Sequence, residues 1–173
     1  KKLYVGLDVR RCVWHTWASN VGRNGVWQMY DVVRCETEEE WLAERRKGIG
    51  ASDIAAILGL SPWQTPLTVY ASKLGISEQE ETEAMRDGKD MEPIVIDRLM
   101  ADDGFRERFP GAKIERNTDI FVSREWPFLR CTPDAVLMRE GQCSILVELK
   151  TTGRAESWDD GVPPMYVAQV QHQ

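Results

Sequence analysis

Three polar residues in the second half of the chain have the types and the spacing of a catalytic site. Asp134 follows a Thr-Pro pair, and after thirteen intervening residues the chain reads Glu148, Leu149 and Lys150. Because side chains alternate between the two faces of a strand, Glu148 and Lys150 are expected on one face. If a hairpin pairs the two segments, Asp134 lies beside Glu148. Adjacent carboxylates repel each other, and a divalent ion that prefers hard oxygen ligands, such as Mg²⁺ or Mn²⁺, relieves this repulsion.

This combination of two carboxylates and a lysine suits the hydrolysis of a phosphodiester. A bound metal ion would offset the charge that grows on the phosphate, and Lys150 would orient the attacking water or help to deprotonate it. The pattern resembles that of the PD-(D/E)XK nucleases. On its own the pattern is weak, because a solvated strand with a surface Glu and Lys produces the same letters by chance.

Other short motifs in the chain strengthen this resemblance. In chain order they are Trp41-x-x-x-Arg45, Gly50-Ala51-Ser52, Gly88-x-x-x-Glu92, Thr132-Pro133-Asp134, Glu148-Leu149-Lys150 and Tyr166-x-x-Gln169-Val170-Gln171. Together they resemble the YqaJ-type viral recombinases, to which the lambda-type phage exonucleases are similar. The resemblance runs from about Met29 to the end of the chain, in the family's order and with familiar spacing.

The resemblance implies a particular activity and particular partners. It implies a Mg²⁺-dependent alkaline exonuclease, with Mn²⁺ as a substitute metal, that acts on the ends of linear double-stranded DNA. Such an enzyme resects the 5′ strand and leaves a 3′ single strand for a single-strand annealing protein. A homo-oligomeric ring is a further implication of the resemblance.

The resemblance also assigns roles to residues of the expected metal site. Asp134 and Glu148 would bind the metal ion, and the backbone carbonyl of Leu149 would complete the set. Lys150 would position the attacking water. Glu92 would add a ligand directly or through water, although it lies in an acidic stretch of a kind that is more often a solvated face.

Three more residues receive roles from the resemblance. Gln169 would contact the active-site water or the lysine. Arg45 and Ser52 match the pair that holds the 5′-terminal phosphate. This role suits their chemistry, because an arginine can form a bidentate phosphate contact and Ser52 is expected to open a helix whose first N–H groups favour an anion. The neighbouring Arg46 or Lys47 could make the phosphate contact instead.

The fold expected around these residues is α/β and restriction-endonuclease-like, with N-terminal helices followed by a small central mixed or antiparallel sheet flanked by helices. Caps and apolar spacing predict a helix at 83–103, with Pro93 as a kink or a restart and an apolar stripe of Met91, Ile94, Val95 and Leu99. Ser52 and Thr65 are expected to cap two shorter helices. The other predicted helices span 38–47, 53–58 and 66–74, with one more after 163–164, and the predicted strands span 113–116, 120–123, 128–130, 134–138 and 144–151.

Residues 1–28 differ in composition from the rest of the chain. They hold three of the seven Trp and five basic residues, with Asp8 as their one acid. One interpretation is that Met29 is the natural start and that 1–28 are read-through sequence. The alternative is an N-terminal hairpin of strands 3–9 and 13–17. Residues 29–173 would then be a YqaJ-like exonuclease domain, truncated where 164–173 read as a helix in progress.

Charge and composition narrow the class of protein. The formal net charge of −6 excludes broad nonspecific adhesion to DNA, because such binders carry a basic excess, but it leaves room for a local grip on a strand end. Residues 78–92 alone contribute −5, while basic residues gather at 45–47. No apolar run is long enough for a membrane span, and without a signal-peptide pattern the bacterial or phage-infected cytoplasm is the expected compartment.

Other functions remain open at this point. One is an endonuclease of the same fold, such as a restriction or junction-cleaving enzyme, which would need no free end. Another is a DNA-binding module that has lost catalysis, although intact Asp134, Glu148 and Lys150 argue against it. A third interpretation uses residues 4–9, which look like the first strand of the RNase H-like transposases with Asp8 as a ligand.

Overall fold

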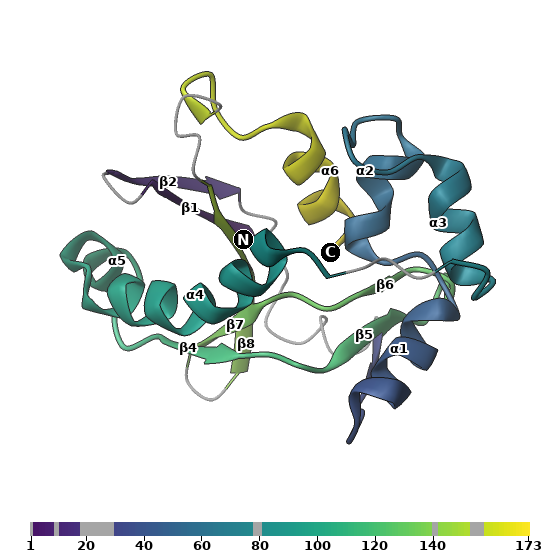
Figure 1. Cartoon of the computed structure of the whole chain (residues 1–173). Helices are drawn as coiled ribbons and strands as arrows, with labels where there is room; N and C mark the ends of the chain where they lie inside the picture. The colour runs from purple at the N-terminus through teal and green to yellow at the C-terminus, as the bar shows by residue number, and fades with distance from the viewer. Residues whose placement is uncertain (1, 9–10, 18–29, 78–80, 140–141, 153–157) are drawn as a thin grey trace. The chain divides into compact units, whose positions relative to one another are not determined.

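The protein folds into two compact units, each assembled from three separate stretches of chain (Figure 1). The computed structural model describes residues 2–8, 11–17, 30–77, 81–139, 142–152 and 158–173. The first unit comprises Lys1–Asn20, Glu81–Asn117 and Pro133–Asp159, and the second comprises Val21–Glu80, Thr118–Thr132 and Asp160–Gln173. The expected α/β class is confirmed.

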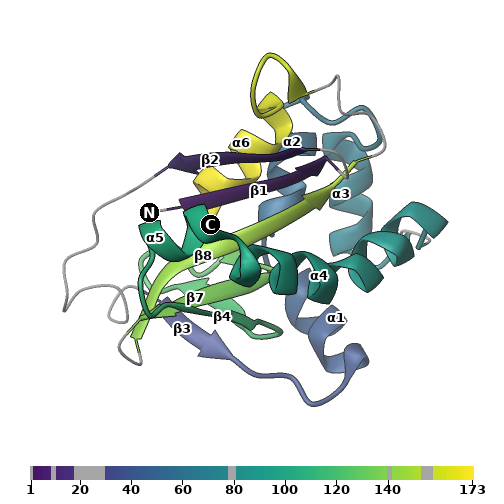
Figure 2. The same cartoon turned by 90° about the vertical axis from the view of Figure 1, so that its left-hand side faces the viewer.

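The first unit is built on a five-stranded mixed sheet with the strand order β2-β1-β8-β7-β4. Neighbouring strands run antiparallel except β1 and β8, which are parallel. The strands are β1 (Lys2–Asp8), β2 (Arg11–Trp17), β4 (Lys113–Arg116), β7 (Ala135–Arg139) and β8 (Gln142–Thr151). The helices α4 (Glu83–Ala101) and α5 (Asp103–Arg108) lie against one face of this sheet (Figure 2).

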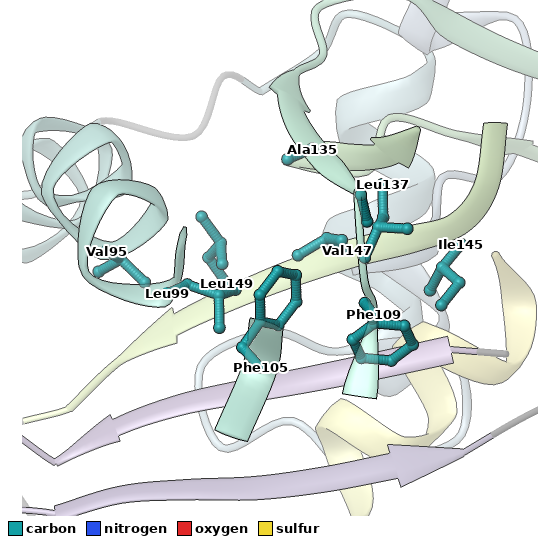
Figure 3. Close-up of a cluster of buried hydrophobic side chains, with 10 residues drawn as sticks. Val95, Leu99, Phe105, Phe109, Ala135, Leu137, Ile145, Val147 and Leu149 are labelled. Atoms are coloured by element: carbon teal, nitrogen blue, oxygen red, sulfur yellow. The ribbon is translucent and has the colours of Figure 1, made fainter. Parts of the chain in front are cut away.

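An apolar cluster joins these helices to the sheet. Figure 3 shows side chains from α4 and α5 turned toward side chains from β7 and β8. The buried members of this cluster are Val95, Leu99, Phe105, Phe109, Ala112, Ala135, Leu137, Ile145, Val147 and Leu149. Because Val147 and Leu149 face this core, the alternation of side chains turns Glu148 and Lys150 to the opposite face of β8.

The helix α4 begins where the sequence predicts but ends at Ala101, and Asp102 then caps the separate helix α5, which was not predicted. Thr82 caps α4 by accepting the N–H of Met85, and the helix continues through Pro93 without a restart. The expected apolar stripe is partly wrong, because Ile94 is 43% exposed whereas Val95 and Leu99 are buried. With 3.6 residues per turn, the buried face follows Val95 and Leu99, and Ile94 lies to its side.

Leu99 should therefore contribute much more to stability than its neighbour on the same helix. We expect Leu99→Ala to lower the free energy of unfolding by about 2–5 kcal/mol, because it leaves a cavity in a closed core. Ile94→Ala, the matched control on the exposed side, should cost less than about 1 kcal/mol. Urea denaturation of both variants measures the difference, and equal losses would contradict the assignment of the core.

The second unit holds a three-stranded antiparallel sheet, β3-β5-β6, and several short helices. Within this unit α2 packs against α6, the 3₁₀ turn η2 and α3. The elements are β3 (Tyr30–Val33), α1 (Glu38–Arg46), η2 (Ala51–Asp53), α2 (Ile54–Ile57), α3 (Pro66–Lys73), β5 (Ile120–Ser123), β6 (Arg130–Cys131) and α6 (Pro164–His172). None of the helices in the described part of the chain is long and apolar enough to cross a membrane.

Several strand predictions need correction. The strands β4 and β5 have the expected bounds, but they belong to different sheets, so the single expected sheet is wrong. The strand expected at 128–130 is instead β6 at Arg130–Cys131, because the preceding residues form a turn in which the N–H of Leu129 bonds to the carbonyl of Trp126. The strand β3 also precedes the helices, and the expected order did not include it.

The N-terminal hairpin is present. β1 and β2 pair from Lys2↔Trp17 to Asp8↔Arg11, which agrees with the hairpin interpretation, while Val9 and Arg10 lie outside the described residues. β1 also extends the sheet by pairing in parallel with β8, from Leu3↔Val147 to Leu7↔Thr151. The interpretation of 1–28 as read-through sequence is not tested by this arrangement and stays a prediction.

Candidate active site

The register of β7 and β8 places Asp134 next to Glu148. Ala135 pairs with Val147, so Asp134, one residue before β7, lies across from Glu148. The Asp134 carboxylate accepts the N–H of Leu149 through Oδ2 at 2.6 Å. Asn117 holds this end of β7 from the other side, because its N–H donates to the Asp134 carbonyl and its side chain donates to the Pro133 carbonyl. The expected hairpin geometry is confirmed.

Lys150 completes this cluster. Its Nζ donates to Glu148 Oε1, and the two side chains share one face of β8. Glu148 is only 3% exposed, while the Lys150 side chain is 24% exposed. A carboxylate as buried as this needs a cationic partner, since taking it out of water is costly. The structure therefore brings together the three residues from which the site was predicted.

Asp134 carries the strongest electrostatic perturbation of the site. Burial, and then the negative charge of Glu148, raises the pKa of Asp134 to about 7. The Lys150 charge and the hydrogen bond from Leu149 act in the opposite direction without cancelling this rise. Two carboxylates that disfavour each other's charge form a site to which a divalent cation adds favourable charge.

Glu92 is held by a different partner. Its carboxylate forms an ion pair with Arg116 at 3.0 Å. Burial raises the pKa of Glu92, the positive charge of Arg116 opposes that rise, and the charge of Glu148 adds to it. Among the residues that the structure describes, no three His, Cys, Asp or Glu side chains gather closely enough to hold a metal ion. The role of Glu92 as a ligand stays a prediction.

The donor set nevertheless fits Mg²⁺. Asp134 and Glu148 offer carboxylate oxygens, and the carbonyl of Leu149 offers a third oxygen. In a strand, the N–H and C=O of one residue point to the same side, so the carbonyl of Leu149 faces the side on which its N–H meets Asp134. Mg²⁺ commonly keeps several waters and takes one or two carboxylates from a protein. Three hard oxygens at this position therefore match what the ion requires.

Arg45 and Ser52 form a second cluster, in the second unit. Arg45 Nη2 donates to Ser52 Oγ at 3.0 Å, so the predicted pair is in contact. The guanidinium lies over the ring of Trp41, 4.6 Å from its centroid, which explains the Trp41-x-x-x-Arg45 spacing on α1. Burial lowers the pKa of Arg45, and the negative charge of Asp53 opposes this. A partly desolvated guanidinium beside a hydroxyl can bind an anion.

The expected role of Ser52 as a helix cap is wrong. Ser52 lies inside η2, which Gly50 precedes, and Asp53 precedes the four-residue α2 without capping it through its side chain. Asp53 Oδ2 instead accepts the N–H of Gly50 at 2.7 Å. This bond tightens the chain into a 3₁₀ turn and shortens the following helix. The anion-binding argument from a helix that Ser52 opens therefore does not apply, and the Ser52 hydroxyl serves as a partner of Arg45.

Gln169 lies on α6, whose other residues fasten the helix within the second unit. His172 Nε2 lies 2.9 Å from the Arg130 carbonyl and 3.2 Å from the Ile49 carbonyl. These contacts join the last turn of α6 to the backbone on both sides of the Ile49↔Leu129 bridge. Asp134, Glu148 and Lys150 belong to the first unit, so the expected contact of Gln169 with the lysine stays a prediction.

Three residues of these clusters were missed by sequence reasoning. Arg116 pairs with Glu92, while Asp53 and Lys73 lie next to Arg45. Asp53 could have been found from its position three residues after Gly50, which is the spacing of a side chain that bonds back to a turn. Lys73 has no local signal, because it meets the Arg45 carbonyl from 28 residues away.

Comparison with known proteins identifies the family. The family model of the YqaJ-like viral recombinase domain matches residues 40–173. The chain belongs to the YqaJ-like viral recombinase family. It is also 35% identical over 142 residues to YqaJ, an uncharacterised protein of Bacillus subtilis (strain 168). That alignment covers 79% of this chain and 41% of the relative, so the chain spans less than half of that protein's length.

The YqaJ-like match contains every residue to which the resemblance assigned a role. Arg45, Ser52, Glu92, Asp134 and Gln169 all fall within 40–173, as do the residues of the Glu148-Leu149-Lys150 segment. β1, β2 and Asp8 precede the match. The RNase H-like interpretation of Asp8 therefore gains no support from the YqaJ-like assignment, whereas the nuclease interpretation does.

Proposed function

We propose that this YqaJ-like chain is a metal-dependent exonuclease that resects the 5′ strand of linear double-stranded DNA during phage-type recombination. The observation that carries the proposal is the cluster of Asp134, Glu148 and Lys150 at the junction of β7 and β8. Two carboxylates and a lysine gathered at two neighbouring strands support a nuclease of the PD-(D/E)XK type. Membership of a viral recombinase family supports a role in DNA recombination.

Mg²⁺ is the proposed cofactor, and Mn²⁺ should substitute for it. Asp134, Glu148 and the Leu149 carbonyl would hold the ion, and Glu92 could contribute through water once it is released from Arg116. When bound, the ion would act as a Lewis acid that offsets the charge developing on the scissile phosphate. The raised pKa of Asp134 supports this proposal, because the site is strained by like charges in the absence of a cation.

The protein's own groups would orient the reaction. The N–H of Leu149 holds one oxygen of Asp134, which fixes the side chain and leaves the other oxygen for the cation. Lys150 lies on the same strand face as Glu148 and can hold the attacking water beside that carboxylate. Its ammonium can also stabilise negative charge as the water loses its proton. Gln169 would help to orient the same water.

Arg45 and Ser52 are proposed to bind the 5′-terminal phosphate. Arg45 offers a charged planar donor group, and the hydroxyl of Ser52 already lies within hydrogen-bonding distance of it. Recognition of a terminal phosphate would make cleavage begin at a strand end, which distinguishes an exonuclease from an endonuclease of the same fold. An annealing protein that receives the 3′ strand and a homo-oligomeric ring complete the proposal.

Three DNA substrates test this function in the full-length protein. We expect Mg²⁺-dependent degradation of linear 5′-phosphorylated duplex, slower degradation of 5′-hydroxyl duplex, and no cutting of closed circular duplex. EDTA should stop all hydrolysis, because the paired carboxylates would have no cation between them. Labels on either end of the linear duplex, followed by gel electrophoresis, would report the direction.

The outcomes separate the alternatives. Cleavage of closed circles would overturn the exonuclease in favour of an endonuclease. DNA binding without hydrolysis of any substrate, with either Mg²⁺ or Mn²⁺, would indicate an inactive binding module.

A further inference from the structure

A lysine that belongs to no predicted motif lies next to the Arg45 and Ser52 pair. Lys73, the last residue of α3, forms an ion pair with Asp53 Oδ2 at 2.6 Å. The same Nζ donates to the backbone carbonyl of Arg45 at 3.0 Å. One ammonium therefore links the end of α1, the turn η2 and the end of α3, which are the elements around the proposed phosphate site.

The negative charge of Asp53 beside Arg45 needs a compensating cation. Asp53 is near enough to Arg45 for its negative charge to favour the guanidinium ion. Asp53 and Lys73 side chains are only 13% and 20% exposed, so water and salt screen them weakly. A carboxylate in this position would compete with a phosphate for Arg45 and would repel the phosphate itself. Lys73 cancels that charge at close range.

Backbone contacts also depend on Asp53. Its Oδ2 accepts the N–H of Gly50 as well as the ammonium of Lys73. A Cβ built at Gly50 would lie 3.2 Å from Asp53 Oδ2 and 3.9 Å from Arg45 Nη2, so the turn runs close to both charged groups. The carboxylate thus shapes the turn that carries Ser52, which gives the acid a structural role beside the proposed phosphate site.

We propose that Lys73 is a positioning residue that neutralises Asp53 and so keeps Arg45 and Ser52 available to the terminal phosphate of DNA. The inference rests on the proposed phosphate role of the pair and extends it to a residue with no phosphate contact of its own. Asp53 shapes the turn, and Lys73 removes the electrostatic penalty that this acid would impose on an anionic ligand. This role predicts that the preference for the phosphorylated end, lost when the charge of Lys73 is removed, returns when Asp53 is neutralised as well.

The test compares the affinity of the full-length protein for 5′-phosphorylated and 5′-hydroxyl duplexes, measured by fluorescence anisotropy in EDTA so that no hydrolysis occurs. Lys73→Met should reduce the preference for the phosphorylated end about tenfold, because a mostly buried carboxylate then opposes the phosphate. Lys73→Arg should retain the preference. The double variant Asp53→Asn with Lys73→Met should recover most of it. Arg34→Met, which removes an exposed cation paired with Asp119, is the matched charge control.

Each outcome decides between the claims. If Arg45→Ala keeps the preference, the phosphate role of the pair is overturned and the inference with it. If Arg45→Ala loses the preference while Lys73→Met stays within about twofold of the unmodified protein, only the inference is overturned. A double variant as impaired as Lys73→Met would show that Lys73 serves the fold rather than the charge balance. Thermal unfolding of each variant checks that the comparison is made on folded protein.

Discussion

Asp134→Asn is expected to abolish nuclease activity while making the metal-free protein more stable. The substitution removes one of the two carboxylates proposed to hold Mg²⁺, so turnover should fall by about 10³-fold or more. The same change removes a charge that the folded protein disfavours, because burial and Glu148 raise the pKa of Asp134 to about 7. The asparagine oxygen can still accept the N–H of Leu149, so the local backbone keeps its hydrogen bond.

The pH dependence of this effect has a definite sign. Because the pKa of Asp134 is higher in the folded protein than in the unfolded chain, the folded state binds more protons between the two values. The contribution of Asp134 to stability is therefore complete at acidic pH and is lost as the pH rises from about 4 to 7. In EDTA at pH 8, the free energy of unfolding of Asp134→Asn should be about 1–3 kcal/mol higher than that of the unmodified protein. This is less than the full pKa shift would give, because Asp134 is partly exposed and solvent screens its charge.

Thermal unfolding in EDTA at pH 5 and pH 8 measures this difference. Asp97→Asn is the matched control, because Asp97 is an exposed acid on α4 in the same unit. The control should change stability by less than about 0.5 kcal/mol at either pH. Asp134→Asn with lower stability than the unmodified protein at pH 8 would contradict the proposed repulsion between the two carboxylates. In saturating Mg²⁺ the unmodified protein should become the more stable of the two, because it keeps both carboxylates proposed to bind the ion.

How much of the site could be predicted from the sequence depends on how far apart in the chain the interacting residues lie. Asp134 and Glu148 are joined by one hairpin, so alternation and spacing were enough to place them together. Arg45 and Ser52 are seven residues apart and came from the family motif, and the structure places their side chains in contact, while their phosphate role stays a prediction. The partners of Glu92 and Arg45 lie on separate elements, and neither Arg116 nor Lys73 carries a local signal.

The same limit explains the errors in the fold. The strands β4 and β5 were located correctly, yet their partners depend on contacts between distant segments, and β5 pairs with β3 rather than joining β4 and β7. The parallel pairing of β1 with β8 joins segments that lie near opposite ends of the chain. Ser52 was misplaced for a local reason, because an acid three residues after Gly50 competes with a serine cap and closes a 3₁₀ turn.

Lys150→Ala should remove most catalysis without removing the proposed metal ligands. The lysine donates to the buried Glu148 carboxylate and lies on the face of β8 where the attacking water is proposed to bind. Loss of its ammonium should lower turnover by about 10²–10⁴-fold, the range expected for a group that positions water and stabilises developing charge. Affinity for the DNA end, measured in EDTA, should change by less than about threefold, because Arg45 and Ser52 are intact.

Stability separates this catalytic role from a structural one. Removal of Lys150 takes a cation from the buried Glu148 and should cost about 1–3 kcal/mol in EDTA. Mg²⁺ should recover much of that loss, since the ion would replace the missing positive charge, yet turnover should stay low.

Lys150→Arg should also stay slow, because a planar guanidinium does not reproduce the geometry of an ammonium. Lys113→Ala, on the exposed edge strand β4 of the same sheet, is the matched control and should retain full activity. Recovery of turnover together with stability in Mg²⁺ would show that Lys150 only balances the charge of Glu148, and would remove it from the proposed chemistry.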